Sequence, residues 1–163
     1  MNTKFIIVMG VSGSGKTTIG NALAQRLKWD FYDADSFHPA ENITKMANGI
    51  PLNDDDRRPW LNSLHDLITS CIKTKFPGVL ACSALKERYR QTLVENNQDV
   101  QIVYLKGDYE LISSRMGTRT GHYMKPQMLR SQFAALEEPT NAQVMDVSIP
   151  FDEIVGKIIK TIV

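Results

Sequence analysis

The fold of this chain is decided by Gly10-Val11-Ser12-Gly13-Ser14-Gly15-Lys16-Thr17, which matches the pattern G-x-x-x-x-G-K-[ST] directly after the apolar run FIIVM at 5–9. Glycines let a backbone wrap closely around phosphate groups, so that its N–H groups point inward. The helix expected next adds the positive end of its dipole at the same place. Lys16 can reach the β- and γ-phosphates, and the Thr17 hydroxyl can bind Mg²⁺. Residues 10–17, with Thr18 after them, are therefore predicted to bind a nucleoside triphosphate with Mg²⁺.

The bulk composition indicates one soluble globular domain spanning residues 1–163, with 42% hydrophobic and 23% charged residues. A net charge of +1 without a long basic run argues against nucleic acid as the main partner. No apolar stretch approaches the ~18 residues that cross a membrane. Cys71 and Cys82 lie in apolar segments without metal-ligand spacing, as expected of buried thiols in a reducing cytosol. The first strand follows residues 1–4 without a signal peptide, so we expect a cytoplasmic protein.

Short apolar runs alternate with helical patterns along the chain, which is typical of a parallel α/β sheet. Strands are expected at 5–9, 31–34, 79–82, 100–105 and 144–147. Helices are expected after the glycine-rich loop as far as residue 27, at 38–48, from 59–60 to 72, and at 83–95, 109–116, 126–136 and 154–162. Ligands of such sheets bind at the carboxyl ends of the strands, where Gly10, Asp33, Asp35 and Ser83 are expected.

Two carboxylates, Asp33 and Asp35, follow the second expected strand. In an enzyme with this glycine-rich loop, one carboxylate can hold Mg²⁺, directly or through water, while the other takes the proton of an acceptor hydroxyl. We assign Asp33 to the metal and Asp35 to the acceptor. The third expected strand ends in Ser83 instead of the aspartate that often supports magnesium, which leaves Asp33 as the best-placed metal ligand.

A longer set of residues resembles the gluconate kinases, at similar spacing over nearly the whole chain. It comprises DADSFHP at 33–39, Asn42, KM at 45–46, GIPL at 49–52, DDDR at 54–57, PWL at 59–61, ACSALK at 81–86, YR at 89–90, Arg115, Arg119, GHYM at 121–124, SQ at 131–132 and LEEP at 136–139. One departure is Ala34, where glycine is expected between the two aspartates. The side chain there is still small.

The resemblance implies ATP-dependent phosphorylation of D-gluconate at its 6-hydroxyl, giving 6-phospho-D-gluconate, with ATP and Mg²⁺ as cofactors. It also implies the P-loop kinase fold shared with shikimate and nucleoside monophosphate kinases. That fold has five parallel strands flanked by helices and a mobile lid, here over about residues 115–136. A homodimer is frequent in the family.

Gluconate is a flexible polyol with a carboxylate at one end, so its site needs donors, acceptors and a cation. Asp35 suits the reacting hydroxyl. A helix at 38–48 would place His38 and Lys45, seven residues apart, on one face. Arg57 and Lys86 are the two candidates for the cation, and exposed N–H groups at a helix start near Ser83 suit an anion or a polyol oxygen. The expected substrate-binding residues are Asp35, His38, Lys45, Arg57, Ser83 and Lys86.

Arg115 and Arg119 are four residues apart, which is one turn of a helix. On a closing lid, their guanidinium groups would neutralise charge on the γ-phosphoryl and exclude water. We therefore expect Lys16, Asp35, Arg115 and Arg119 to be catalytic, with His122 positioning the lid. Cys82 is expected to be core, because phosphoryl transfer needs no nucleophilic thiol.

Four other functions compete with this interpretation. A shikimate kinase would show a glycine triplet after the third strand, where this chain has Cys82-Ser83-Ala84. A nucleoside monophosphate kinase would need a base-recognition element on the acceptor side. A regulatory GTPase needs D-x-x-G and N-K-x-D segments, which are absent. A non-catalytic nucleotide-binding module remains open, although Lys16 and Asp35 give no sign of lost chemistry.

Overall fold

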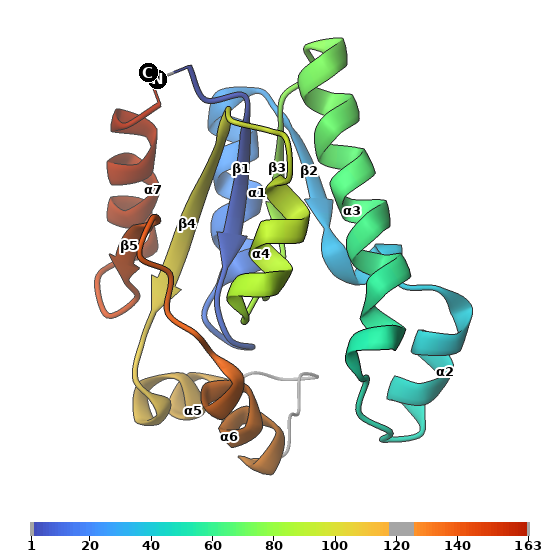
Figure 1. Cartoon of the computed structure of the whole chain (residues 1–163). Coiled ribbons are helices and arrows are strands. Elements are labelled where there is room, and N and C mark those ends of the chain that lie inside the picture. The colour runs from blue at the N-terminus through green and yellow to red at the C-terminus, as the bar shows by residue number, and fades with distance from the viewer. Residues whose placement is uncertain (1, 118–125, 163) are drawn as a thin grey trace.

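The computed structural model describes residues 2–117 and 126–162, and its centre is a five-stranded sheet (Figure 1). The strands are β1 (Phe5–Met9), β2 (Asp30–Asp33), β3 (Gly78–Ala81), β4 (Val100–Lys106) and β5 (Gln143–Asp146), and their spatial order is β2-β3-β1-β4-β5. Every neighbouring pair is parallel. The predicted five-stranded parallel sheet is therefore confirmed, with each strand within two residues of its expected ends.

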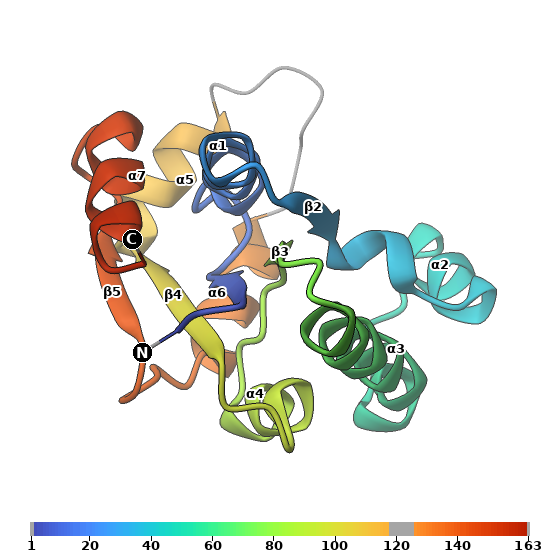
Figure 2. The same cartoon turned by 90° about the horizontal axis from the view of Figure 1, so that it is seen from above.

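Helices cover both faces of the sheet (Figure 2). The helices α1 (Lys16–Leu27) and α7 (Phe151–Lys160) lie on one face, and α3 (Asp54–Thr74) and α4 (Glu87–Val94) lie on the other. Alternate side chains of β1 enter the two cores: Phe5 and Ile7 pack toward α3, while Ile6 packs toward α1 and α7. All residues of β1 are completely buried, as expected of a central parallel strand.

The remaining helical segments lie beyond the carboxyl ends of the strands, at the end of the molecule opposite the two termini (Figure 1). They are η1 (Ala34–Phe37), α2 (Ala40–Ala47), α5 (Tyr109–Gly117) and α6 (Pro126–Ala135). A small apolar cluster of Val11, Leu85, Ile112 and Leu129 joins α5 and α6 to the glycine-rich loop. Within the described residues, none of the helices has the length and apolar character needed to cross a membrane.

The start of α3 corrects the sequence-based prediction, which placed it at residues 59–60. The helix begins at Asp54, because Asn53 and Asp56 form a capping box. The Asn53 side chain accepts from the Asp56 N–H at 2.8 Å, and the Asp56 carboxylate accepts from the Asn53 N–H at 3.0 Å. Pro59 consequently lies inside the helix, and Arg57 belongs to it instead of preceding it.

The predicted starts of α4 and α2 were also wrong. The helix α4 begins at Glu87 instead of Ser83, because Ala84 has a φ of 45°, which right-handed helices exclude. The helix α2 begins at Ala40, so His38 precedes it, and helical spacing does not relate His38 to Lys45. Ser83 and His38 therefore lie before these helices and not within them.

We expect Asn53→Ala to lower the free energy of unfolding by about 1 kcal/mol, because the Asp56 N–H at the start of α3 loses its side-chain cap. Urea unfolding followed by circular dichroism measures the change. Asn62→Ala is the matched control, since Asn62 is exposed within the same helix, where alanine is the better helix former. An Asn53→Ala variant as stable as the control would show that the capping box contributes nothing.

Candidate active site at the carboxyl edge of the sheet

The glycine-rich loop between β1 and α1 has backbone conformations and close contacts that only glycine accommodates. Gly13 and Gly15 have φ angles of 81° and 101°. A Cβ added at Gly13 would lie 2.5 Å from the Met116 side chain, and one at Gly15 would lie 2.8 Å from the Phe151 ring. The loop is thus packed directly against α5 and α7, and its backbone is bent in the way that anion-binding loops require.

Lys16 lies over this loop. Its Nζ donates to the carbonyl oxygens of Gly10 at 3.1 Å and Val11 at 3.0 Å. Burial lowers the pKa of Lys16, while the negative charges of Asp35 and Asp33 oppose that shift. The ammonium group is therefore bound to the loop and lies within electrostatic reach of the two carboxylates.

The residues of the loop fit a nucleotide phosphate. The Ser14 hydroxyl is buried and, in the described part of the chain, has no hydrogen-bond partner. Thr17 and Thr18, at the start of α1, are exposed. A buried hydroxyl without a partner inside a loop of N–H groups is costly unless a ligand occupies the loop.

A magnesium ion would need more ligands than the chain supplies there. Across residues 2–117 and 126–162, no three His, Cys, Asp or Glu side chains are grouped to hold a metal. Mg²⁺ commonly takes one or two carboxylates and completes its shell with phosphates and water. Thr17 and Asp33 fit that pattern.

Asp33 and Asp35 have different surroundings. Asp33 is the last residue of β2, and its Oδ1 accepts from the Asp35 N–H at 3.0 Å, which caps η1. Asp35 is exposed, and no side chain of the described residues pairs with its carboxylate. The capped turn thus directs Asp35 beyond the end of the strand.

His38 follows η1 and stacks on Trp60 of α3. The ring centroids are 4.3 Å apart and the planes differ by 10°. Its Nδ1 lies 3.2 Å from Asn42 Nδ2. Burial lowers the pKa of His38, and its electrostatic neighbours are Asp35 and Arg57. His38 is thereby placed beside the proposed acceptor carboxylate.

Lys45, on α2, forms an ion pair with Asp56 at 2.8 Å. The bond lowers the pKa of Asp56 and joins α2 to the start of α3. The side chain of Lys45 is 39% exposed, and an ammonium group carries three donors, of which the bond to Asp56 uses one. His38, α2 and the start of α3 together form the α2–α3 arm of the molecule. Lys45 and His38 both lie on this arm, but different contacts hold their side chains.

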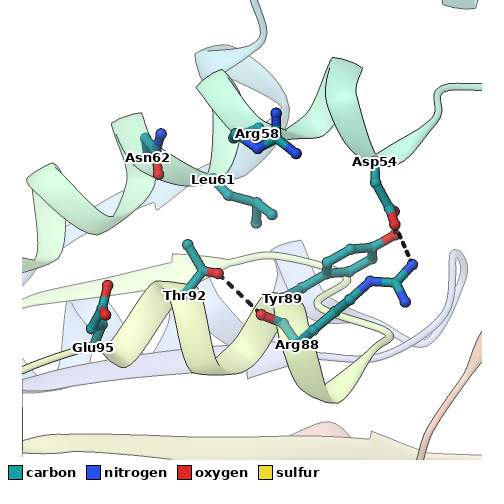
Figure 3. Close-up of a pocket in the computed structure, with 8 residues that line it drawn as sticks. All are labelled: Asp54, Arg58, Leu61, Asn62, Arg88, Tyr89, Thr92 and Glu95. Carbon is teal, nitrogen blue, oxygen red and sulfur yellow. Dashed lines mark hydrogen bonds and ion pairs between the residues drawn. The ribbon is translucent and has the colours of Figure 1, made fainter.

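Arg57 is held by Tyr89 of α4. Its Nη1 donates to the Tyr89 hydroxyl at 3.2 Å, and that hydroxyl donates to Asp54 at 2.7 Å. Figure 3 shows Tyr89 with Asp54 and Arg88 at one end of a groove of about 380 Å³ between α3 and α4. Hydrogen bonds from Tyr89 and Arg88 lower the pKa of Asp54, and Lys86 adds to the effect. Arg57 and Lys86, the two candidates for a carboxylate partner, therefore both lie near Asp54.

The residues after β3 have separate roles. The carbonyl of Ser83 accepts from the Gly10 N–H at 3.4 Å, so this half-buried residue adjoins the glycine-rich loop. Cys82 is 1% exposed, and burial raises its pKa to about 12. The prediction that Cys82 belongs to the core is confirmed, and its thiol is not a nucleophile near neutral pH.

Of the expected lid arginines, Arg115 lies on α5, with its guanidinium 5.8 Å from the centre of the Phe151 ring. Hydrogen bonds from Ser148, together with the charge of Arg115, lower the pKa of Asp146. Arg115 thus borders the loop after β5. Arg119 and His122 lie outside the described residues.

Comparison with known proteins shows the family to which this chain belongs. The family model for shikimate kinase matches residues 12–162. The thermoresistant gluconokinase of Escherichia coli is 44% identical over 160 residues, which cover 96% of this chain and 91% of that protein. A crystal structure of a gluconokinase from Sinorhizobium meliloti has a TM-score of 0.88 at 40% identity, covering 99% of this chain and 93% of that one. This chain belongs to the gluconokinase family.

Membership in the gluconokinase family confirms the resemblance carried by residues 33–139 and the P-loop kinase fold. It makes the protein a phosphotransferase with an alcohol group as acceptor. An APS kinase from Mycobacterium tuberculosis, with a TM-score of 0.70 at 16% identity, shares the fold. The P-loop, Asp35 and the α2–α3 arm are therefore parts of a kinase.

Two contacts of this gluconokinase-family chain were not expected from sequence. The Ser12 N–H in the P-loop donates to Gln132 Oε1 at 2.7 Å, and Gln132 Nε2 donates to Ser12 Oγ at 3.0 Å. The buried Arg90 donates to the carbonyls of Ala84 and Glu137, each at 2.7 Å. Both residues fall within the resemblance, at SQ and YR, but nothing local in the sequence indicates these partners. They tie the segment after residue 126 to the P-loop and to the loop after β3.

Proposed function

We propose that this protein is an ATP-dependent gluconokinase, which transfers the γ-phosphoryl group of ATP to the 6-hydroxyl of D-gluconate. The observation that carries the proposal is the convergence of Lys16, Asp35 and His38 at the carboxyl edge of the sheet. The family supports gluconate as the acceptor, because curated relatives covering most of the chain are gluconokinases.

In the proposed reaction, residues 10–18 hold the phosphates of ATP. Backbone N–H groups of the loop and the start of α1 bind their oxygens, and Lys16 turns its ammonium from the carbonyls of Gly10 and Val11 to the phosphoryl group. Arg115, with Arg119, neutralises charge that develops on that group. Thr17 and Asp33 hold Mg²⁺, which when bound screens the phosphate charges.

The acceptor half of the reaction belongs to Asp35. Its carboxylate takes the proton of the 6-hydroxyl while that oxygen forms a bond to the γ-phosphorus. The bond between this phosphorus and the oxygen of ADP breaks, and the products are ADP and 6-phospho-D-gluconate. Asp35 then releases its proton to water.

The remaining substrate contacts come from the α2–α3 arm and from the residues after β3. His38, Lys45 and Ser83 offer hydrogen bonds to the polyol. Arg57 or Lys86 holds the substrate carboxylate. Arg57 is the better fixed of the two, because Tyr89 binds its guanidinium.

ADP release by the purified protein with ATP and Mg²⁺ tests the proposal. The acceptors are D-gluconate, shikimate, other sugar acids and nucleoside monophosphates. We expect strong stimulation by gluconate alone. A response to shikimate or another acid alone would keep the kinase mechanism and replace the substrate, whereas ATP binding without any turnover would favour a non-catalytic module.

We also propose a cytoplasmic homodimer. Free, buried Cys71 and Cys82 support a reducing compartment. Ile43 and Ile50, which are 54% and 49% exposed on and beside α2, offer apolar surface to a second copy. Light scattering after gel filtration measures the mass, and a monomer would contradict the assembly without touching the kinase assignment.

A further inference from the structure

The side-chain amide of Asn42 has a defined orientation. Asn42 is 3% exposed, although it lies on the otherwise exposed α2. Its Nδ2 is 2.8 Å from the backbone carbonyl oxygen of Asp56. A carbonyl oxygen only accepts hydrogen bonds, so the nitrogen of the amide, and not its oxygen, must face α3.

The orientation of Asn42 determines where His38 carries its proton. The same Nδ2 lies 3.2 Å from His38 Nδ1. An amide nitrogen has two N–H donors and accepts nothing, so Nδ1 must be the unprotonated, accepting nitrogen. The neutral imidazole then carries its proton on Nε2.

The plane of the imidazole is set by Trp60. The stacked ring of Trp60 is 6% exposed, and its Nε1 donates to the Ala34 carbonyl at 2.7 Å. Ala34 directly precedes Asp35 in η1. One buried indole therefore holds both the His38 ring and the turn that carries the acceptor carboxylate.

The charges that face His38 come from two elements. Asp35 of η1 favours the imidazolium, whereas Arg57 of α3 disfavours it, and burial, the largest effect, also lowers the pKa of His38. Asn42 of α2 and Trp60 of α3 are uncharged. Protonation of Nδ1 would also set an N–H against the Asn42 amide, so the contacts and the charges agree.

We propose that Asn42 is a positioning residue, which holds His38 in its neutral Nε2–H form so that Nε2 donates to an oxygen of the sugar acid bound beside Asp35. Within the described residues, no protein group accepts from Nε2. The identity of the acceptor rests on the proposed function, whereas the tautomer is a property of the chain alone.

A neutral His38 also keeps the Asp35 carboxylate available as a base. An imidazolium next to Asp35 would form an ion pair with its carboxylate and make it a weaker base. The neutral ring binds substrate through one hydrogen bond and leaves that carboxylate available for the proton of the hydroxyl.

Nitrogen-15 NMR of the three histidines tests the tautomer directly. His38→Gln identifies the signals of His38. We expect an unprotonated Nδ1 and a protonated Nε2 in the substrate-free wild type at neutral pH. In Asn42→Asp, a carboxylate can accept from Nδ1–H, so we expect that nitrogen to become protonated and the KM for gluconate to rise about tenfold. The KM for ATP should stay unchanged.

Asn48→Asp is the matched control, because Asn48 is an exposed asparagine at the end of the same helix. It should change neither the His38 signals nor the KM for gluconate. A wild type with its proton on Nδ1 would overturn the proposal, even if Asn42→Asp failed to fold. So would an Asn42→Asp enzyme with unchanged His38 signals and unchanged KM values. A wild type that phosphorylates no sugar acid would instead remove the proposed function, and the spectrum would still decide the tautomer.

Discussion

Lys16→Ala lowers the kcat of gluconate phosphorylation by about 10²–10³-fold and weakens ATP binding. The Lys16 ammonium lies over the P-loop, bound to the carbonyls of Gly10 and Val11, and faces the negative charges of Asp33 and Asp35. Its removal takes away the side-chain cation that the loop itself supplies to the β- and γ-phosphates. The effect falls on both affinity and rate, because the phosphates carry charge before and during transfer.

Steady-state kinetics with ATP and gluconate, together with calorimetric titration of ATP, measure the two losses. Lys157→Ala is the control, because Lys157 lies on α7 and pairs with Glu153 at the surface. We expect the control to behave as the wild type. A Lys16→Ala enzyme with normal rate and affinity would overturn the assignment of residues 10–18 as the nucleotide site.

Asp35→Asn lowers kcat by about 10²–10⁴-fold, the range typical of a lost general base, while ATP still binds. The amide keeps the size of the side chain and the hydrogen bond between the Asp35 N–H and Asp33. It cannot take the proton of the 6-hydroxyl. The loss should therefore appear in turnover, with little change in the unfolding midpoint.

Asp55→Asn is the matched control for this change, because Asp55 is exposed and pairs with Arg58 at 3.0 Å on the surface of α3. Near-normal turnover by Asp35→Asn would remove Asp35 as the partner of the hydroxyl. Asp33→Asn distinguishes the roles of the two carboxylates. It should raise the Mg²⁺ concentration needed for half-maximal rate, because Asp33 is the proposed metal ligand.

Local sequence was sufficient for much of the fold. The FIIVM run predicts a strand at 5–9, and β1 spans those residues and is completely buried. The P-loop pattern predicts a strand-loop-helix unit, which the chain forms between β1 and α1. Asp108 directly precedes α5, and its carboxylate accepts from the Leu111 N–H at 2.8 Å as an N-cap. Arg58 pairs at the surface with Asp55, three residues earlier in the same helix. Such features depend on neighbours along the chain, where residue type decides the outcome.

Helix starts were predicted less well, because more than one residue near a start can act as the start signal. Pro59-Trp60 suggested the start of α3, whereas the capping box of Asn53 and Asp56 sets it earlier. A proline that suits a first helical turn does not exclude an earlier start when a cap satisfies the N–H groups before it. For α4 the error is in the opposite direction. The left-handed backbone of Ala84 makes this helix begin later in the sequence than predicted.

By itself, then, the sequence determined the P-loop, the alternation of strands and helices, and the residue types available for phosphoryl transfer. Only the tertiary structure decided which side chains hold those residues in place. Tyr89 binds Arg57 from 32 positions away, and Gln132 binds Ser12 from 120 positions away. Trp60 and Asn42 orient His38 only because α2 and α3 fold against η1. These contacts depend on the packing of elements that are distant in sequence, and no local pattern of residue types encodes that packing.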